Sequence, residues 1–387
     1  MKPNVMSPIR VMRIIARMNV GGPAVQVSGL MRGFNSNEFE HRLYTGFCTS
    51  DEADYLDTNA PDIGVTRING LGKRVSFNGD IKAFINLVKA IRQFKPHIIH
   101  THTAKAGFLG RLASLISLQQ TIRVHTFHGH LLNGYFGSFK RFLVVIAEKF
   151  LSTFTHHLLA VGDKVRQDLL EVGIGKLEKF GIMPPGLELS ALLPKFESQK
   201  SLGLTNDRIQ CLFIGRMTQI KRPDRFLDVV SEIKKRAVNL DFFMVGDGEL
   251  LNMCRERIAL ENLPVKVLGW QSDIEKVFSA SDMVLLTSDN EGTPLSLIQA
   301  GMAGLPVVTT NVGSVPEIVL DGKTGIISGL NVQELADGIE KLSNSPTFRE
   351  QLGSAAQAFT LANFGVQRLV HDHEEVYKKL LSSRAKF

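Results

Sequence analysis

The sequence predicts an α/β protein made of two successive Rossmann-like units, each with parallel strands and crossover helices. Its 387 residues are enough for two domains that each bury a core. Apolar runs of strand length alternate with longer stretches of helical periodicity. Glycines also follow an early predicted strand in each half, Gly21 and Gly22 in the first and Gly215 in the second. Such turns are typical of strand-to-helix loops in this fold class.

The composition is ordinary for a globular protein, with 44% hydrophobic and 21% charged residues. The first residues lack the apolar core of a signal peptide, and no apolar run approaches the roughly 18 residues of a membrane span. Three cysteines lie far apart without the spacing of metal ligands, so we expect buried free thiols in a reducing compartment. These features predict a cytoplasmic protein.

Positive charge is concentrated in the first half. Residues 1–193 contain 23 Lys and Arg against 14 Asp and Glu, whereas the remainder contains 22 against 24. A basic half suits a phosphate-bearing partner, an anionic membrane surface or nucleic acid. No basic run with interleaved aromatics, zinc-finger spacing or helix-turn-helix phrase is present, so we expect no nucleic-acid partner.

The predicted elements of the first half are strands at 11–16, 42–47, 97–100, 124–130, 158–161 and 180–183, and helices at 24–34, 80–94 and 163–171. Residues 38–79 are otherwise loop-rich. Gly21 and Gly22 separate the first strand from the first helix, where a bare backbone lets a phosphate approach closely.

Four polar residues lie at or beyond the end of the predicted strand 97–100. His100 and His102 alternate at its end, which could suggest a metal site, but no carboxylate or cysteine lies near enough to complete one. We therefore favour structural histidines. Lys105 and Arg111 open the next helix, where they could meet an acceptor phosphate, although solvated charges are the more ordinary interpretation.

Residues 131–161 form a strongly amphipathic stretch in which aromatic and aliphatic residues mix with Lys140, Arg141 and Lys149. Two interpretations stay open. The helix either packs in the core with one solvated face, or rests on a membrane surface and presents a lipid-linked acceptor.

A proline–glycine phrase at 184–193, followed by a polar stretch through Ser201, marks the expected domain boundary. We assign residues 1–188 to the first domain and 189–365 to the second. The last helix, 366–387, is expected to return to the first domain and pack on it, as is usual in a fold of two such units.

The second half opens with a predicted strand, 209–214, that runs into Gly215 and Arg216. Arg216 and Lys221 lie five residues apart just past this strand end, so both can reach one diphosphate. Another glycine turn, 246–248, follows a later strand and is more simply structural. The remaining predicted elements are strands at 241–245, 265–268 and 324–327, and helices at 224–238, 274–280, 332–343 and 347–359.

The richest stretch is 283–310, which reads as strand, helix and strand. A buried strand at 283–286 leads to a polar loop with the acidic pair Asp289 and Glu291. Thr293 is the expected N-cap and Pro294 the first residue of a helix that ends near Gly304. A carboxylate and free backbone N–H groups thus gather at the carboxyl end of a strand. The expected ligand carries phosphate and hydroxyl groups.

The phrase EGTPLSLIQA, with its following glycine-rich turn and strand, resembles the signature of family 4 of the retaining glycosyltransferases. The phrases HTHTAKAGFLGRLAS and PPGLELS are similar to others in that family, so the resemblance covers nearly the whole chain. It implies the GT-B fold, in which two Rossmann-like domains face each other across a cleft. The family signature has two glutamates; Glu291 fills the first place, and Gln299 occupies the second.

The resemblance implies a role for each matched residue. His128 would lie against the donor sugar, Arg216 and Lys221 would grip the donor diphosphate, and Glu291 would contact the sugar hydroxyls. Gln299 would accept one hydrogen bond from the ribose in place of the two that a glutamate accepts. The implied catalytic residues are His128, Glu291, Arg216 and Lys221. The implied donor-binding residues are Gly21, Gly22, Arg216, Lys221, Thr293, Leu295, Ser296 and Gln299.

The implied activity is retaining transfer of a sugar, most simply a UDP-linked hexose or N-acetylhexosamine, to a glycan or polyprenyl-linked acceptor in cell-surface polysaccharide synthesis. We expect no metal and no further cofactor, because no Asp-x-Asp motif occurs. Gln299 leaves a non-catalytic nucleotide-sugar-binding relative open, and a sugar-nucleotide epimerase shares the architecture. A dinucleotide oxidoreductase is disfavoured, since no G-x-G-x-x-G follows any strand.

Overall fold

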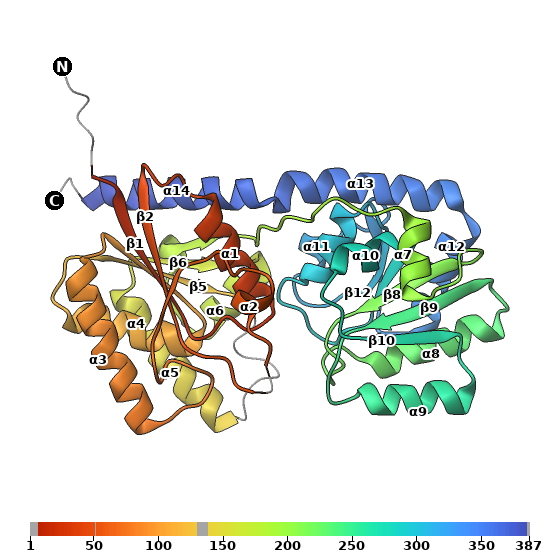
Figure 1. Cartoon of the computed structure of the whole chain (residues 1–387), viewed down its shortest axis with the longest axis horizontal. Coiled ribbons are helices and arrows are strands. Elements are labelled where there is room, and N and C mark those ends of the chain that lie inside the picture. The colour runs from red at the N-terminus through yellow and green to blue at the C-terminus, as the bar shows by residue number, and fades with distance from the viewer. Residues whose placement is uncertain (1–6, 51, 130–137, 385–387) are drawn as a thin grey trace, which may run out of the picture. The chain divides into compact units, whose positions relative to one another are not determined.

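The structure, a computed structural model, describes residues 7–50, 52–129 and 138–384. The chain divides into two compact units, shown in Figure 1. Unit 1 comprises Met1–Gly186 and Val366–Phe387, and unit 2 comprises Leu187–Gly365. The division falls two residues before the boundary expected from the sequence.

Unit 1 is built on a parallel sheet whose strand order is β3-β2-β1-β4-β5-β6-β7. Its strands are β1 (Ile9–Ile15), β2 (Phe39–Thr45), β3 (Val65–Arg67), β4 (Ile98–His102), β5 (Ile122–Phe127), β6 (His157–Ala160) and β7 (Phe180–Ile182). Its helices are α1 (Gly22–Gly33), α2 (Tyr55–Thr58), α3 (Phe77–Phe94), α4 (Ala104–Ile116), α5 (Ser138–Phe154), α6 (Asp163–Glu171) and α14 (Val366–Arg384), with a 3₁₀ turn at Leu177–Lys179.

Alternate residues of each strand point to opposite sides of the sheet, so each face carries apolar side chains that need covering. Helices cover both faces. On one face Met12 and Ile14 of β1 join a core cluster with α3 and α4. On the other face Val11 packs with Leu369 and Tyr377 of α14. The last helix therefore packs on unit 1, as the sequence predicted.

Unit 2 repeats the arrangement with a parallel sheet of order β10-β9-β8-β11-β12-β13. Its strands are β8 (Ile209–Ile214), β9 (Leu240–Val245), β10 (Val265–Gly269), β11 (Met283–Leu286), β12 (Val307–Thr310) and β13 (Gly325–Ser328). Its helices are α7 (Lys195–Leu202), α8 (Pro223–Lys235), α9 (Leu251–Glu261), α10 (Ile274–Ser279), α11 (Leu295–Met302), α12 (Val332–Asn344) and α13 (Pro346–Phe364), with a 3₁₀ turn at Val315–Glu317.

In each unit the strand order reverses beside the first strand, between β1 and β4 and between β8 and β11. Ligands of open parallel sheets bind outside the carboxyl ends of the strands at such a point. The loops after β1, β4, β8 and β11 are therefore the places where a site is expected.

Several sequence predictions need correction. Residues 38–79 contain α2 and β3 besides the predicted strand, and the expected linker before Ser201 is largely α7. These elements are short or polar, so they leave little periodic signal. Of the three cysteines, all free thiols, Cys211 and Cys254 are buried as expected, but Cys48 is partly exposed. No helix in the described ranges is long and apolar enough to span a membrane.

Arg111 is not a solvated charge. Its guanidinium is 1% exposed and its Nη2 lies 2.7 Å from both carboxylate oxygens of Glu148 on α5, itself 3% exposed. The Nε of Arg111 donates to the Gly107 carbonyl at 2.8 Å. Lys105 pairs with Asp80 at 2.6 Å. Both cations thus join the helices of unit 1 to one another, and the interpretation as solvated charges was wrong.

Candidate functional site

Arg216 and Lys221 lie in the loop between β8 and α8. The Arg216 side chain is exposed and forms no hydrogen bond or ion pair with the described residues. The loop packs against the 246–248 turn, and the Met217 N–H donates a hydrogen bond to the Asp247 carbonyl at 2.9 Å. A Cβ at Gly246 would lie 1.9 Å from the Gly215 carbonyl oxygen. That glycine turn therefore has the structural role expected for it, which is to let two loops pack closely.

Glu291 lies beyond β11 and is 7% exposed. Its Oε1 accepts hydrogen bonds from Lys221 Nζ at 2.5 Å and from Ser288 Oγ at 2.6 Å. Lys221 is 18% exposed in this ion pair. The structure thus brings together two residues that are 70 positions apart in sequence and that the sequence assigned to different parts of one ligand.

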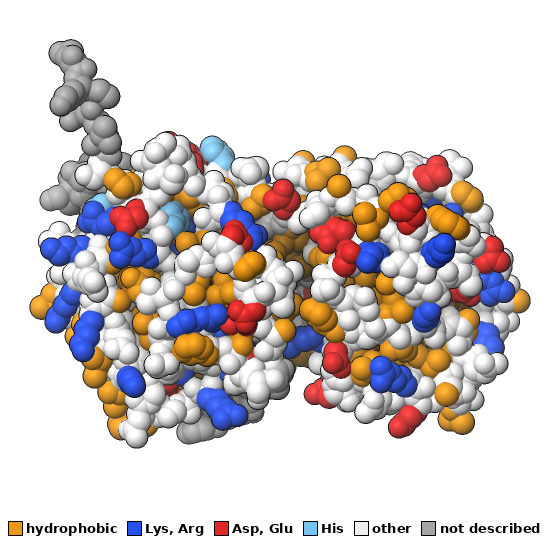
Figure 2. All heavy atoms as spheres, in the orientation of Figure 1, with side chains coloured by type: hydrophobic (Ala, Val, Ile, Leu, Met, Phe, Trp, Pro, Cys, Tyr) orange, Lys and Arg blue, Asp and Glu red, His pale blue; other side chains and the backbone are white. Residues whose placement is uncertain are grey.

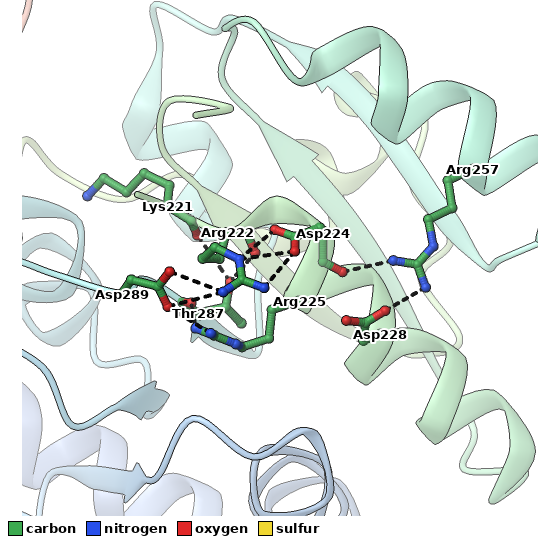
Figure 3. A network of polar contacts seen from close by, with 8 residues as sticks. All are labelled: Lys221, Arg222, Asp224, Arg225, Asp228, Arg257, Thr287 and Asp289. Atoms are coloured by element: carbon green, nitrogen blue, oxygen red, sulfur yellow. Dashed lines mark hydrogen bonds and ion pairs between the residues drawn. The ribbon is translucent and has the colours of Figure 1, made fainter. Parts of the chain in front are cut away.

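Asp289, the other member of the acidic pair, has a structural role (Figure 3). It accepts from Arg225 Nη2 at 2.7 Å and from Arg222 Nη1 at 3.1 Å. Thr287 Oγ1 also donates to the Arg222 carbonyl at 2.9 Å. This network joins the loop after β8 to the loop after β11. In Figure 3 the ammonium end of Lys221 extends away from it.

Gly313, to which the sequence gave no role, supports the Glu291 loop from the other side. It has a φ of +53°, and a Cβ there would lie 1.8 Å from the Glu291 carbonyl oxygen. The next residue, Ser314, donates its N–H to that same oxygen at 3.1 Å. The loop after β12 thus packs directly on the Glu291 backbone. The sequence signal that could have identified Gly313 is its position in a glycine turn just after a strand.

The helix start at α11 differs by one residue from the prediction. The N-cap is Pro294 rather than Thr293, and α11 begins at Leu295. The Pro294 carbonyl accepts from the N–H groups of Leu297 and Ile298. The N–H groups of Leu295 and Ser296 have no such bond within the described ranges. They lie at the positive end of the helix dipole, which favours an anion.

Gln299 lies about one turn further along α11. Its side chain is partly exposed and forms no hydrogen bond with the part of the chain that the structure describes. At the end of the same helix Gly304 has a φ of +72°, consistent with its predicted role as the stop.

In unit 1, Gly21 caps α1 and Gly22 is its first residue. The loop is braced by hydrogen bonds from Val20 N–H to the Ala53 carbonyl at 3.1 Å and from Tyr55 N–H to the Met18 carbonyl at 2.7 Å. A Cβ at Gly21 would meet only the Asn19 carbonyl oxygen, 4.0 Å away. Packing therefore does not require a glycine here, which suits a backbone that a ligand approaches.

His128 follows β5, and its Nε2 lies 2.9 Å from Nδ1 of His102. Burial lowers the pKa of His128 to about 4, so the ring is neutral at neutral pH. His100 bonds to Thr126 Oγ1 at 2.7 Å and to the Tyr377 hydroxyl at 2.6 Å, as a structural histidine does. Among the described residues no group of three His, Cys, Asp or Glu side chains could hold a metal ion.

The predicted site residues therefore form two groups, each beyond the carboxyl ends of the strands of its own unit. Gly21, Gly22 and His128 belong to unit 1. The unit 2 group is Arg216, Lys221, Glu291, Thr293, Leu295, Ser296 and Gln299.

Comparison with known proteins identifies the family of this chain. Residues 20–191 match the model of Glycosyltransferase Family 4, and residues 194–359 match that of Glycosyl transferases group 1. Over 291 residues the chain is 30% identical to the UDP-Gal:alpha-D-GlcNAc-diphosphoundecaprenol alpha-1,3-galactosyltransferase of Escherichia coli, covering 72% of this chain and 73% of the relative. The chain belongs to family 4 of the glycosyltransferases.

Further relatives agree with this assignment. The capsular polysaccharide biosynthesis glycosyltransferase CapM of Staphylococcus aureus is 24% identical over 330 residues, which cover 83% of this chain and 86% of CapM. Among solved structures, Anabaena Alr3699/HepE in complex with UDP has a TM-score of 0.79 at 19% identity, covering 96% of this chain and 100% of that one. Sucrose-phosphate synthase from Thermosynechococcus elongatus has a TM-score of 0.80 at 17% identity, covering 97% and 100%. The predicted GT-B fold is confirmed.

Proposed function

We propose that this glycosyltransferase binds a UDP-sugar through unit 2 and transfers the sugar, with retention, to a glycan or polyprenyl-linked acceptor in cell-surface polysaccharide synthesis. The observation that carries the proposal is the Lys221–Glu291 pair, which lies in the loops beside the open N-terminus of α11 and the exposed Arg216. The E. coli relative is named for a UDP-linked donor and a diphosphoundecaprenol acceptor, and the HepE structure contains UDP.

The diphosphate would be held by charge and by backbone donors. Arg216 offers a planar fork of N–H groups and Lys221 a point charge, while Leu295 and Ser296 offer N–H groups at a helix start. Negative charge grows on the leaving phosphate as the bond to the sugar breaks, so these donors stabilise the transition state. With this positive charge from the protein, the reaction is proposed to need no metal ion.

Glu291 of unit 2 would hold hydroxyls of the transferred sugar, and His128 of unit 1 is the residue that the family resemblance assigns to the donor sugar. The Glu291 carboxylate is fixed by Lys221 and Ser288, so it is already oriented to accept bonds from sugar hydroxyls. The bond from the anomeric carbon to the phosphate breaks, and a bond to the acceptor oxygen forms on the same face. The acceptor proton passes to the departing phosphate, so atoms and charge balance.

The first measurement is calorimetric titration of UDP, GDP and ADP in the presence of EDTA. We expect micromolar UDP binding that falls by at least about 100-fold in the Arg216→Ala, Lys221→Ala double variant, since a hydrogen bond to a charged group contributes about 1.5–3 kcal/mol. The control is Lys235→Ala, which removes a lysine that is 73% exposed on α8. Undiminished binding in the double variant would place the diphosphate elsewhere. No binding of any nucleotide to the wild type would contradict the proposal and indicate that the donor site has lost its function.

Gln299→Glu is expected to tighten UDP binding by roughly tenfold. A carboxylate accepts both ribose hydroxyls with a charge, whereas the amide offers one acceptor oxygen, a difference of about 1–2 kcal/mol. Gln299→Leu, which has no acceptor, should weaken binding in the same titration. Equal affinities for all three proteins would show that the ribose is held by other residues.

We also propose that α5 places the protein on the inner face of the membrane. Residues 131–137 of the predicted amphipathic stretch lie outside the described residues. Within α5, Phe142, Leu143, Ile146 and Phe150 are each 49–59% exposed at helical spacing. In Figure 2 the visible face of unit 1 shows mostly Lys and Arg among its charged side chains, whereas both signs mix on unit 2. An apolar stripe on a basic unit suits an anionic bilayer.

Flotation with vesicles tests this surface. The wild type is expected to float with anionic vesicles at low salt. With neutral vesicles it is expected to remain in the bottom fraction. Phe142→Ser with Phe150→Ser should lower the partition constant for the vesicles about 100-fold or more, because each buried aromatic side chain contributes about 1.5–3 kcal/mol. Leu260→Ser in unit 2, where that leucine is 87% exposed, is the matched control. Equal flotation of all three proteins would reject α5 as the contact.

A further inference from the structure

His102, the last residue of β4, lies against the ring of His128. Its Nδ1 is 2.9 Å from Nε2 of His128, which is a hydrogen-bond distance. His102 is fully buried and stacks on His100 with ring centroids 4.3 Å apart. His128 is therefore bonded to a ring that is itself fixed in the core of unit 1.

The position of the shared proton follows from the other nitrogen of His102. Its Nε2 is buried and has no hydrogen-bond partner within the described ranges. A proton on Nε2 would leave a buried N–H without an acceptor, which is rarer and costlier than a bare lone pair. Neutral His102 therefore carries its proton on Nδ1 and donates it to Nε2 of His128.

Both rings are neutral at neutral pH. Burial holds the pKa of His102 well below its ordinary value and lowers that of His128 to about 4. Protonation of His102 is further disfavoured by the nearby Arg13 and by the neighbouring His128, His373 and His125, which lower its pKa in the same direction. The pair thus shares one hydrogen bond with a defined donor.

A neutral histidine that accepts at Nε2 carries its own proton on Nδ1. We propose that His102 is a positioning residue that keeps His128 in the Nδ1–H tautomer, so that His128 donates a hydrogen bond to an oxygen of the transferred sugar. This inference rests on the proposed function, to which the contact between His128 and the sugar belongs. It also excludes His128 as a general base, since the hydrogen bond from His102 occupies its one lone pair.

The tautomer can be read directly by long-range proton–nitrogen NMR on the full-length protein labelled at histidine. His128 is assigned from the signals lost in His128→Asn. At neutral pH we expect His128 to show a protonated Nδ1 and an unprotonated Nε2. A protonated Nε2 at His128 would overturn the proposal, whatever the activity of the enzyme.

Two variants of His102 test the positioning role. His102→Leu removes the donor, whereas His102→Asn places an amide N–H near the position of Nδ1. In a panel of UDP-glucose, UDP-galactose and UDP-N-acetylglucosamine without acceptor, we expect His102→Leu to slow UDP release about tenfold or more. His102→Asn should retain most of the rate. UDP affinity should be equal in all three proteins, because UDP contacts unit 2.

The outcomes separate the two proposals. An equal loss in both variants, or no loss in His102→Leu, would overturn the role of His102. A wild type that binds no UDP would instead reject the proposed function, and the NMR result would still decide the tautomer.

Discussion

Lowering the pH from 7 to 5 is expected to unfold unit 1 while unit 2 stays folded. All 11 histidines of the chain lie at positions that belong to unit 1, and residues 187–365 contain none. Burial lowers the pKa of His41 to about 2, of His373 to about 3 and of His128 to about 4. His100, His102 and His125 are shifted in the same direction for the same first cause.

The direction follows from proton binding. Each folded pKa lies below the unfolded value of about 6.5, so the unfolded chain takes up the proton first. Stability is fully present above about pH 6.5 and is lost as the pH falls towards the folded pKa. Each such histidine lowers the free energy of unfolding by about 1.4 kcal/mol for every pH unit below about pH 6.5. His41, His128 and His373 together therefore lower it by about 4 kcal/mol per pH unit. Between about pH 6.5 and pH 5 these three histidines cost about 6 kcal/mol, which exceeds a domain stability at the lower end of the usual range, about 5 kcal/mol.

The measurement is pulsed deuterium labelling after a short incubation at each pH, with peptides assigned by mass spectrometry. Peptides of unit 1 should become labelled near pH 5 while those of residues 187–365 stay protected. Two histidines on α14 supply a matched pair. His373→Gln removes a buried titrating group and should make the pH dependence shallower, whereas His371→Gln, at an exposed position, should change nothing. Loss of both units at one pH would contradict the prediction.

Gly313→Ala is expected to lower UDP-sugar binding and turnover by about 100-fold. The new Cβ would lie 1.8 Å from the Glu291 carbonyl oxygen, so the backbone must move by an ångström or more. That movement displaces the carboxylate that Lys221 and Ser288 orient, and a misplacement of about 1 Å costs on the order of 10² in rate.

Gly322→Ala separates this effect from backbone strain. Gly322 has a φ of +68°, also left-handed, but its Cβ would meet nothing within 4 Å. Both variants should lose about 1 kcal/mol or more of unfolding free energy in urea titrations, from the left-handed conformation alone. Donor binding should fall in Gly313→Ala and be unchanged in Gly322→Ala. Equal donor affinity in both would show that the loop after β12 does not position Glu291.

Local periodicity in the sequence predicted many of the helices and strands. The ends of β8, β11 and α6 agree with the sequence prediction to the residue. Central strands of a parallel sheet are apolar on both faces and appear as continuous runs, which are easy to delimit. By contrast, α2, β3 and α7 are short or polar, and α9 was not predicted. These elements are stabilised by packing, which a local pattern does not record.

The candidate site divides in the same way. The sequence placed Arg216, Lys221 and Glu291 after strands, because turns and strand ends leave local signals. It named Asp289 only as a member of an acidic pair with Glu291, and the structure shows that Asp289 bonds to Arg222 and Arg225. It interpreted Arg111 as a solvated charge because Glu148 lies 37 residues away.

By itself, then, the sequence determined two parallel α/β units, their boundary and the phrases that place the chain in its family. Those features depend on residues that are neighbours along the chain. Only the tertiary structure decided that Lys221 pairs with Glu291, that Gly313 packs on the Glu291 loop, and that His102 bonds to His128. Each of these depends on which distant segments share a buried volume. Burial also sets the protonation of a side chain, so the neutral state of His128 belongs to the fold and not to the local sequence.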